Sequence, residues 1–278
     1  PNGAGSAGGG ALYITANTST RLVELSDCTF QGNYTNNAPG GAIYHTGANS
    51  TLEARGCVFD GNIANYSLGG GLYATSGCKD TLVNCLFHQN KSLSAPAPNY
   101  AGGAIALAGT SGAQTIVNCQ FIENEGTPVG YGGALVTEKN GSGISLTNCL
   151  FAGNKAQYGG AAYFMAEMGV PVIFTNITVA DNVASGPNNS PGSVGGIHME
   201  LSDQVEVYNS ILWGNRDGDS NHTISQQQIR QDPTPPIVQY SCVEGGYPGT
   251  DTGNISSDPY FADSAVNNYR LRSCSPAI

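Results

Sequence analysis

The chain has 278 residues, a formal net charge of −10, and charged side chains at only 11% of its positions. Its ten Lys and Arg residues argue against nucleic-acid binding, which needs a basic stripe to neutralise phosphates. The sequence contains no apolar run near the roughly 20 residues that a membrane-spanning helix needs, so no membrane span is predicted.

Two short boxes alternate along the chain. The first opens on two glycines and recurs as GGALY (9–13), GGAIY (40–44), GGGLY (69–73), GGAIA (102–106), GGALV (132–136), GGAAY (159–163) and GGIHM (195–199). The second ends in Asn and recurs as CTFQGN (28–33), CVFDGN (57–62), CLFHQN (85–90), CQFIEN (119–124), CLFAGN (149–154), ITVADN (177–182) and SILWGN (210–215). The variation in length falls between the boxes, as expected if insertions map to the loops of a fixed coil.

Each box is short, rich in β-forming residues and bounded by Gly, Asn or Pro, which predicts a strand. The segment before each second box, such as 51–56, supplies another strand. Three strands in a unit of about 30 residues make one turn of a β-solenoid. We therefore predict an all-β fold, a right-handed single-stranded parallel β-helix of at least seven coils.

The coils are expected to form one domain with the segment that follows them. Residues 1–215 hold the coils, with boxes at about 9–33, 40–62, 69–90, 102–124, 132–154, 159–182 and 195–215. Residues 216–278, where the boxes vanish into a Pro- and Gly-rich sequence, are expected to form the final irregular coil or coils and a C-terminal tail.

Parallel stacking places equivalent residues of successive coils on top of one another. Cys and Phe of the second box are two positions apart and share a face, which we expect to be the core. This predicts a core ladder of Cys28, Cys57, Cys85, Cys119, Cys149, Phe30, Phe59, Phe87, Phe121 and Phe151. The closing Asn suits a turn, and its amides can bond along the stack. The predicted turn ladder comprises Asn33, Asn62, Asn90, Asn124, Asn154, Asn182 and Asn215. The Tyr of the first box alternates with Leu or Ile without a polar face, so its direction stays open.

The cysteines have two interpretations. Vertical neighbours in the ladder lie within the Cα range of a disulfide, but parallel side chains give poor torsions, so buried thiols are favoured over bridges. Cys242 and Cys274 lie outside the ladder, and a disulfide between them would hold the irregular end. Cys78 is either free or linked to a neighbouring loop.

Sequence patterns of catalysis and metal binding are sparse. Catalytic β-helices use paired carboxylates, or carboxylates that hold Ca²⁺ beside a basic residue. The acids here are scattered singly, at Asp27, Asp60, Glu123, Glu138, Glu167, Asp181 and Glu200, so no catalytic residue is assigned. His198 and His88 are interpreted as packing or turn residues. The loop Asp217-Gly-Asp219-Ser-Asn221 spaces oxygen ligands like the start of a Ca²⁺ loop, but it lacks the distal Glu, so a metal-free polar loop is favoured and no other cofactor is expected.

N-x-S/T triplets are frequent. They begin at Asn17, Asn33, Asn49, Asn65, Asn90, Asn140, Asn176, Asn188, Asn221 and Asn254. Loops rich in Asn, Ser and Thr explain part of this number, and N-glycosylation of a surface protein is the competing interpretation.

The alternating GGAI-type and FxxN boxes over about residues 8–215 resemble the repeats of chlamydial polymorphic membrane proteins, whose passenger regions are β-helical adhesins. The tail, with DPYFAD (258–263) and NYRLRSCSPAI (268–278), resembles the end of secreted β-helix repeat proteins of the pectin-lyase-like superfamily. These resemblances imply a secreted or cell-surface β-helix.

Two functions compete. The first is a non-catalytic extracellular protein, an adhesin or a structural element of a surface layer or filament. It would associate with other surface proteins, with glycans or with itself, head to tail, because exposed β-helix ends invite strand addition. The alternative is a polysaccharide lyase or hydrolase, or a carbohydrate-binding module, which rests on analogy with the superfamily.

Overall fold

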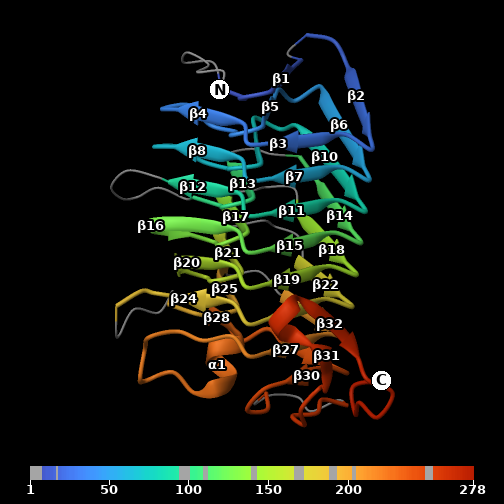
Figure 1. Ribbon diagram of the computed structural model, residues 1–278, viewed down its shortest axis with the longest axis vertical. Helices are drawn as coiled ribbons and strands as arrows, with labels where there is room; N and C mark the ends of the chain where they lie inside the picture. The colour runs from blue at the N-terminus through green and yellow to red at the C-terminus, as the bar shows by residue number, and fades with distance from the viewer. Residues whose placement is uncertain are drawn as a thin grey trace.

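The computed structural model describes residues 8–16, 18–93, 101–108, 112–138, 143–165, 172–187, 193–201, 205–247 and 253–278. It confirms the predicted fold: the chain winds into a right-handed parallel β-helix whose coils stack along one axis (Figure 1). The strands of the coils pair in parallel with their equivalents in the neighbouring coils, so the backbone groups of one coil bond to the coils above and below.

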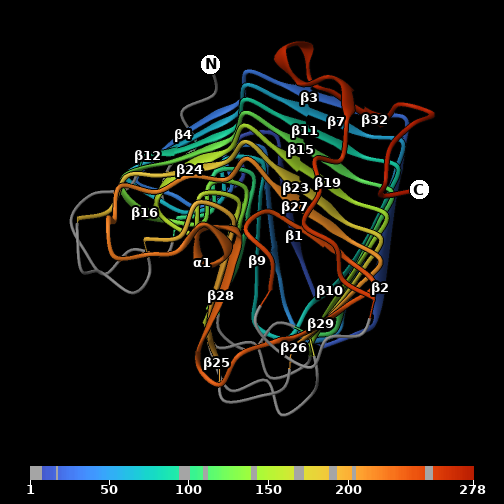
Figure 2. The same ribbon diagram turned by 90° about the horizontal axis from the view of Figure 1, so that it is seen from below.

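Three sheets of eight strands enclose the core (Figure 2). Sheet 1 contains β1 (Leu12–Thr15), β5 (Ile43–Thr46), β9 (Leu72–Thr75), β13 (Ile105–Ala108), β17 (Leu135–Glu138), β21 (Ala162–Met165), β25 (Ile197–Leu201) and β28 (Ile229–Pro233). Sheet 2 contains β2 (Arg21–Ser26), β6 (Ser50–Arg55), β10 (Lys79–Val83), β14 (Gln114–Val117), β18 (Ile144–Thr147), β22 (Val172–Thr175), β26 (Val205–Tyr208) and β29 (Ile237–Gln239). Sheet 3 contains β3 (Thr29–Gln31), β7 (Val58–Asp60), β11 (Leu86–His88), β15 (Gln120–Ile122), β19 (Leu150–Ala152), β23 (Thr178–Ala180), β27 (Ile211–Trp213) and β30 (Cys242–Val243).

A fourth strand per coil, which the sequence did not predict, follows the closing Asn in six coils. Sheet 4 contains β4 (Tyr34–Asn36), β8 (Ile63–Asn65), β12 (Lys91–Leu93), β16 (Glu125–Tyr131), β20 (Lys155–Tyr158) and β24 (Val183–Ala184). These strands are mostly short and polar, so they carry no apolar alternation to mark them. Sheet 4 extends away from the core as an arm, and the chain returns from it to the glycine pair that opens the next coil (Figure 2).

That glycine pair forms a tight corner. Gly40 has a φ of 72°, and a Cβ on Gly41 would collide with the backbone of Gly70 and Ile63. Only glycine allows both the left-handed conformation and this close approach of stacked backbones.

The phenylalanines of the second box fill the interior. Phe59, Phe87, Phe121 and Phe151 are buried, and the rings from Phe30 to Phe151 stack with centroids 4.5–5.0 Å apart and nearly parallel planes. The same register position then holds Val179, Leu212 and Val243. The cysteines at 57, 85, 119 and 149 are buried beside them, and Cys28 of the first coil is half-buried.

The closing asparagines form a continuous hydrogen-bonded ladder. Asn124, for example, accepts two bonds at Oδ1, from the backbone N and the Nδ2 of Asn90, and its own Nδ2 donates to Asn154 Oδ1 and to Phe87 O. The ladder runs from Asn33 to Asn215 and ends on the Oε1 of Gln228. Asn62 and the later asparagines are fully buried, so these bonds satisfy amides that would otherwise be costly to bury.

A second, exposed asparagine ladder lies at the corner between sheets 2 and 3. Asn118, Asn148 and Asn176 adopt φ values near 54°, and the amides of Asn148 and Asn176 each donate to the equivalent Oδ1 of the coil before. Asn tolerates this left-handed conformation better than most residues, which explains the repeated Asn before the Cys.

The stack continues past residue 215, where the sequence boxes end. The helix α1 (Ile224–Gln228) begins with a capping box formed by Thr223 and Gln226, and β28, β29 and β30 then complete an eighth coil. Beyond it, the antiparallel pair β31 (Phe261–Asp263) and β32 (Asn268–Leu271), joined by the 3₁₀ helix Ser264–Val266, lies against the outer face of sheet 3 (Figure 1). Neither helix is long enough to cross a membrane.

Candidate functional site on the outer face of sheet 1

The outer face of sheet 1 carries a row of tyrosines. In β1, Ile14 points into the core, so alternation turns Tyr13 outward, and Tyr44 and Tyr73 are its register partners in the next two coils. Their ring centroids are 5.2 Å apart in both pairs, with planes inclined by 65° and 55°. Tyr13 is 47% exposed and the other two are half-buried. The structure thus gives a direction to the tyrosine of the first box.

Burial raises the pKa of Tyr44 and of Tyr73 above the ordinary value, so both phenols stay protonated at neutral pH. Thr46 and Thr75 follow them two residues further along the same strands and therefore share the outer face. The row therefore offers apolar ring faces together with hydroxyl groups that donate and accept hydrogen bonds.

The row continues under an aromatic cover. Ala106 and Val136 occupy the next two positions and lead to Tyr163, which is buried. Tyr131 of β16 lies 4.7 Å from the Tyr163 ring, and its ring centroid is 4.8 Å from that of Tyr158 on β20. Sheet 4 thereby packs onto the middle of this face and closes it on one side.

A charged group follows the aromatic stretch. His198 is fully buried, its ring lies 4.8 Å from Tyr163, and its Nε2 lies 3.8 Å from Glu200 Oε1. The His198 imidazole lowers the pKa of Glu200, so this carboxyl is ionised at neutral pH. Asp232 is the register partner of Glu200, and Arg230 Nε lies 3.0 Å from Asp232 Oδ2.

This arrangement corrects the expectation that the acids are scattered singly. Glu200 and Asp232 are 32 positions apart, yet they occupy equivalent places on β25 and β28. A second pair joins Asp60 Oδ1 to His88 Nδ1 at 2.8 Å, and the bond with His88 lowers the pKa of Asp60. The sequence did not reveal the first pair because Asp232 lies beyond the last box, whereas Asp60 and His88 hold the same position in consecutive second boxes.

In the loop that resembles the start of a Ca²⁺ site, the carboxylates form hydrogen bonds with other groups of the same loop. Asp217 Oδ1 accepts from the backbone N of Asp219, Asp219 Oδ1 accepts from the backbone N and Nδ2 of Asn221, and Asp217 Oδ2 lies 3.0 Å from His222 Nδ1. His222 Nε2 in turn lies 2.6 Å from Arg230 Nη1. The loop thus connects to the charged end of sheet 1, and Ca²⁺ binding by it stays a prediction.

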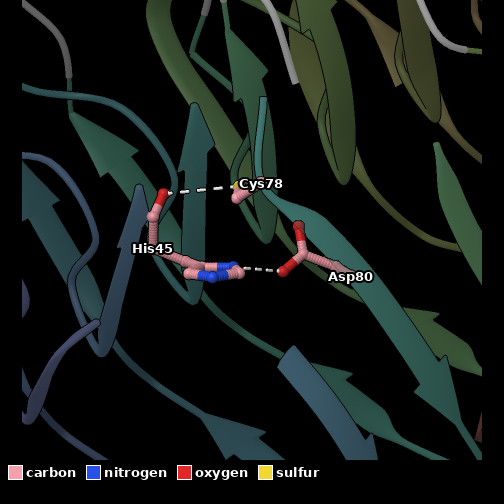
Figure 3. Close-up of side chains that lie close together, drawn as sticks. All are labelled: His45, Cys78 and Asp80. Carbon is pink, nitrogen blue, oxygen red and sulfur yellow. Dashed lines mark hydrogen bonds and ion pairs between the residues drawn. The ribbon is translucent and has the colours of Figure 1, made fainter. Parts of the chain in front are cut away.

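A second cluster of chemically active groups lies inside the coil, at the corner between sheets 1 and 2 (Figure 3). His45 Nδ1 lies 2.6 Å from Asp80 Oδ1, and His45 Nε2 lies 2.7 Å from Ser50 Oγ. Cys78 Sγ lies 3.7 Å from the backbone O of His45. All four residues are at most 3% exposed. Burial raises the pKa of the Cys78 thiol, which is therefore protonated.

The cysteines contain no bridge in the structure. All eight are free thiols. The two cysteines of the candidate pair differ in environment: Cys242 is buried and donates to Ser257 O at 3.2 Å, whereas Cys274 is exposed. Cys78 is likewise unlinked. The suggested disulfide between Cys242 and Cys274 is therefore not formed.

The structure separates the N-x-S/T triplets by exposure. Asn90 is fully buried within the turn ladder, and its amide donates to Phe59 O and Asn124 Oδ1, so the folded coil leaves no room for a glycan there, while glycosylation of the other triplets stays a prediction. Asn33, Asn65 and Asn254 are half-buried, and Asn49, Asn176 and Asn221 are exposed. Asn17, Asn140, Asn188 and the acid Glu167 lie outside the described residues.

Comparison with known proteins agrees with this architecture. A family model described as a right-handed β-helix region matches residues 10–212. No curated protein and no solved structure matches the chain.

Proposed function

The chain belongs to the family of right-handed β-helix regions, and from that premise we propose that it is a non-catalytic, extracellular adhesive protein that binds an extended neutral polysaccharide along the outer face of sheet 1. The observation that carries this proposal is the row of Tyr13, Tyr44 and Tyr73.

The row suits a linear ligand with a repeating unit. Its rings recur at 5.2 Å along the axis of the stack, so successive coils present the same chemistry to successive units of a chain. Aromatic faces pack against the C–H faces of sugar rings, while phenol and threonine hydroxyls bond to sugar hydroxyls. Tyrosine also loses little conformational entropy on binding, because it has only two side-chain torsions.

Charge selects among the candidate polysaccharides. The chain has a net charge of −10, and the face itself carries Glu138, Glu200 and Asp232. Such a field repels polyanions. We therefore infer that the ligand is a neutral glycan rather than an acidic one. We also infer that the protein lies at the cell surface, where it can contact such glycans.

Affinity electrophoresis through gels that contain a soluble β-glucan, a galactomannan or polygalacturonate tests this function. We expect retention by at least one neutral polymer and none by polygalacturonate. The double variant Tyr44→Ala/Tyr73→Ala removes two rings, each worth about 1 kcal/mol, and should weaken binding by about 10-fold or more. Tyr240→Ala is the matched control, because Tyr240 is 57% exposed and lies outside sheet 1. Equal retention of the double variant and the control, or no retention in any gel, would refute the proposal.

A second function is favoured by one observation, the register pair Glu200 and Asp232 beside His198 and Arg230. Paired carboxylates about 5 Å apart are the equipment of retaining glycoside hydrolases. If the wild-type protein releases reducing ends from the same polymers and the Glu200→Gln variant does not, hydrolysis rather than adhesion is the function. Absence of turnover together with tyrosine-dependent retention would leave adhesion as the function.

Self-association stays part of the proposal. Among the described residues, Val23, Leu25 and Phe30 of the first coil are only partly buried, which accords with a contact between stacked chains. The similarity to chlamydial polymorphic membrane proteins stays a prediction, and it accords with an adhesive role.

A further inference from the structure

The cluster of His45, Ser50, Cys78 and Asp80 interrupts columns of stacked residues that are apolar in most other coils. His45 lies between Ile14 and Ala74 in register, and Asp80 lies next to Leu52. A buried imidazole and a buried carboxylate cost free energy compared with the aliphatic residues that occupy these positions in other coils.

The cluster is also incompletely satisfied. Asp80 Oδ1 contacts His45, but Asp80 Oδ2 has no hydrogen-bond partner although the residue is only 3% exposed. Gln114, the register partner of Asp80 in the next coil, also has a buried side-chain oxygen without a partner. Two buried oxygen acceptors without partners lie near an imidazole and a thiol, and a bound cation would compensate the unpaired carboxylate oxygen.

The donor atoms converge. One ligand atom from each of His45, Cys78 and Asp80 lies within 4.8 Å of the other two; the His45 ring of β5 faces Asp80 of β10, and Cys78, just before β10, lies beside His45 (Figure 3). A tetrahedral ion bound at about 2.0–2.3 Å from its ligands needs donor atoms roughly 3.3–3.7 Å apart. Binding would require the 2.6 Å separation of His45 Nδ1 and Asp80 Oδ1 to widen, and the Cys78 Sγ donor to lie at the same spacing from both.

We propose that His45 Nδ1, Cys78 Sγ and a carboxylate oxygen of Asp80 bind a zinc-class divalent transition metal ion inside the β-helix. Imidazole, thiolate and one carboxylate form a donor set typical of Zn²⁺, whereas Ca²⁺ and Mg²⁺ take oxygen ligands. Ser50 acts one step behind the ligands: His45 Nε2 lies 2.7 Å from Ser50 Oγ, and once a metal replaces the proton between Nδ1 and Asp80 Oδ1, Nε2–H would donate to this hydroxyl and hold the imidazole in place.

Binding changes the protonation of the site in a defined way. Cys78 loses its thiol proton to solvent as the Sγ–metal bond forms, and His45 binds as the neutral imidazole. With a thiolate and a carboxylate as ligands, the divalent ion is neutralised within the core. The ion would join β5 of the second coil to β10 of the third, so its role is to tie these coils together.

The first experiment uses the wild-type chain. The protein is unfolded in the presence of a chelator, refolded with or without Zn²⁺, and desalted, and its metal content is measured by inductively coupled plasma mass spectrometry. We expect about one Zn²⁺ per chain and a higher Tm than for the metal-free protein, because a ligand that binds only the folded state stabilises it. Refolding with Co²⁺ should produce a thiolate-to-cobalt charge-transfer band. The proposal fails if the folded wild type retains no metal.

Variants then assign the ligands. Cys78→Ser and Asp80→Asn should lose the charge-transfer band or most of the bound Zn²⁺ while keeping the circular dichroism spectrum of the metal-free wild type. Cys149→Ser is the matched control, since Cys149 is also a buried thiol but lies in the core ladder. This substitution should leave the metal content unchanged. Metal retained equally by Cys78→Ser and Cys149→Ser would overturn the site. If the variants of the cluster do not fold, the cobalt spectrum of the wild type decides.

Discussion

Tyr269 donates its phenol proton to Asp181 Oδ2 at 2.9 Å, across 88 residues of sequence. Two coils earlier in the stack than Asp181, Asn267 Nδ2 donates to Glu123 Oε1 at 3.1 Å. Together these two bonds fix the β31–β32 hairpin to the outer face of sheet 3, at the αL positions that precede the closing asparagines. The C-terminal tail is therefore a folded part of the domain.

The contact of Tyr269 predicts how the tail is released. Tyr269→Phe keeps the ring packed on Phe261 but removes the bond to Asp181, at a cost of about 1 kcal/mol or less for a partly exposed bond. Hydrogen exchange of residues 261–271 should accelerate, while exchange in β11 and β15 should not change. Unaltered exchange in the hairpin would contradict the assignment.

The same contact predicts a pH dependence. Burial, followed by the charge of Asp181, raises the pKa of Tyr269 above the ordinary tyrosine value of 10.0. A raised pKa in the folded state means that the stabilisation is fully present below pH 10 and is lost as pH rises through the folded value. Limited proteolysis should therefore cleave the tail faster above pH 10, and Tyr269→Phe should lack this dependence.

The buried turn ladder predicts a large difference between two asparagines. Asn124→Ala removes the acceptor of Asn90 and the donor to Phe87 O and Asn154, which leaves buried polar groups unpaired at about 1–3 kcal/mol each. Asn148→Gly is the control: it removes an exposed ladder amide and keeps the φ of 54° accessible. Urea denaturation should show a loss of at least about 2 kcal/mol for the first and less than about 1 kcal/mol for the second. Equal losses would show that burial of the amides does not matter.

The thiols should differ in reactivity by position. Cys274 is exposed and Cys28 half-buried, while the remaining six are buried. Burial raises the pKa of Cys149 to about 11 from the ordinary cysteine value of 9.0, so its thiolate is scarce at neutral pH. We expect fast labelling of Cys274, slower labelling of Cys28, and labelling of the others only in denaturant. Stability that depends on neutral Cys149 is fully present below pH 9 and is lost as pH rises toward 11.

Exposure predicts which triplets accept a glycan. When the chain is secreted from a eukaryotic host, peptide mass mapping should find glycans at the exposed Asn49 and Asn221 and none at the buried Asn90. A glycan at Asn90 would require that the turn ladder is open when the transferase acts.

The layers of the coil could be predicted from the sequence because a stacked coil repeats its demands. Phe87 packs against an aromatic neighbour above and below, and Asn124 bonds to another amide on either side, so Phe recurs at one position of the first five second boxes and Asn closes all seven. The tyrosine row recurs too, but its direction required the structure. Tyr44 and Ile43 are adjacent apolar residues, and only the packing of sheet 1 shows which of them faces the core.

The remaining features had no periodic signal. The eighth coil keeps its backbone pairing through β28–β30 although its residues match neither box, because parallel hydrogen bonding does not depend on side chains. His45 and Asp80 lie 35 residues apart at positions that are apolar in most other coils, so each looked like an isolated exception. Glu200 and Asp232 meet only because the intervening segment returns in register.

The one-way turn ladder bears on how such a protein changes length. Every rung is the same exchange, in which Oδ1 of one coil receives the amide of the coil before it. A duplicated coil inserted between Asn90 and Asn124 would find an acceptor on one side and a donor on the other, and its Phe would rejoin the aromatic stack. Gene duplication or engineering can therefore lengthen this protein in whole turns, and each added turn would extend the outer face of sheet 1 by one more position.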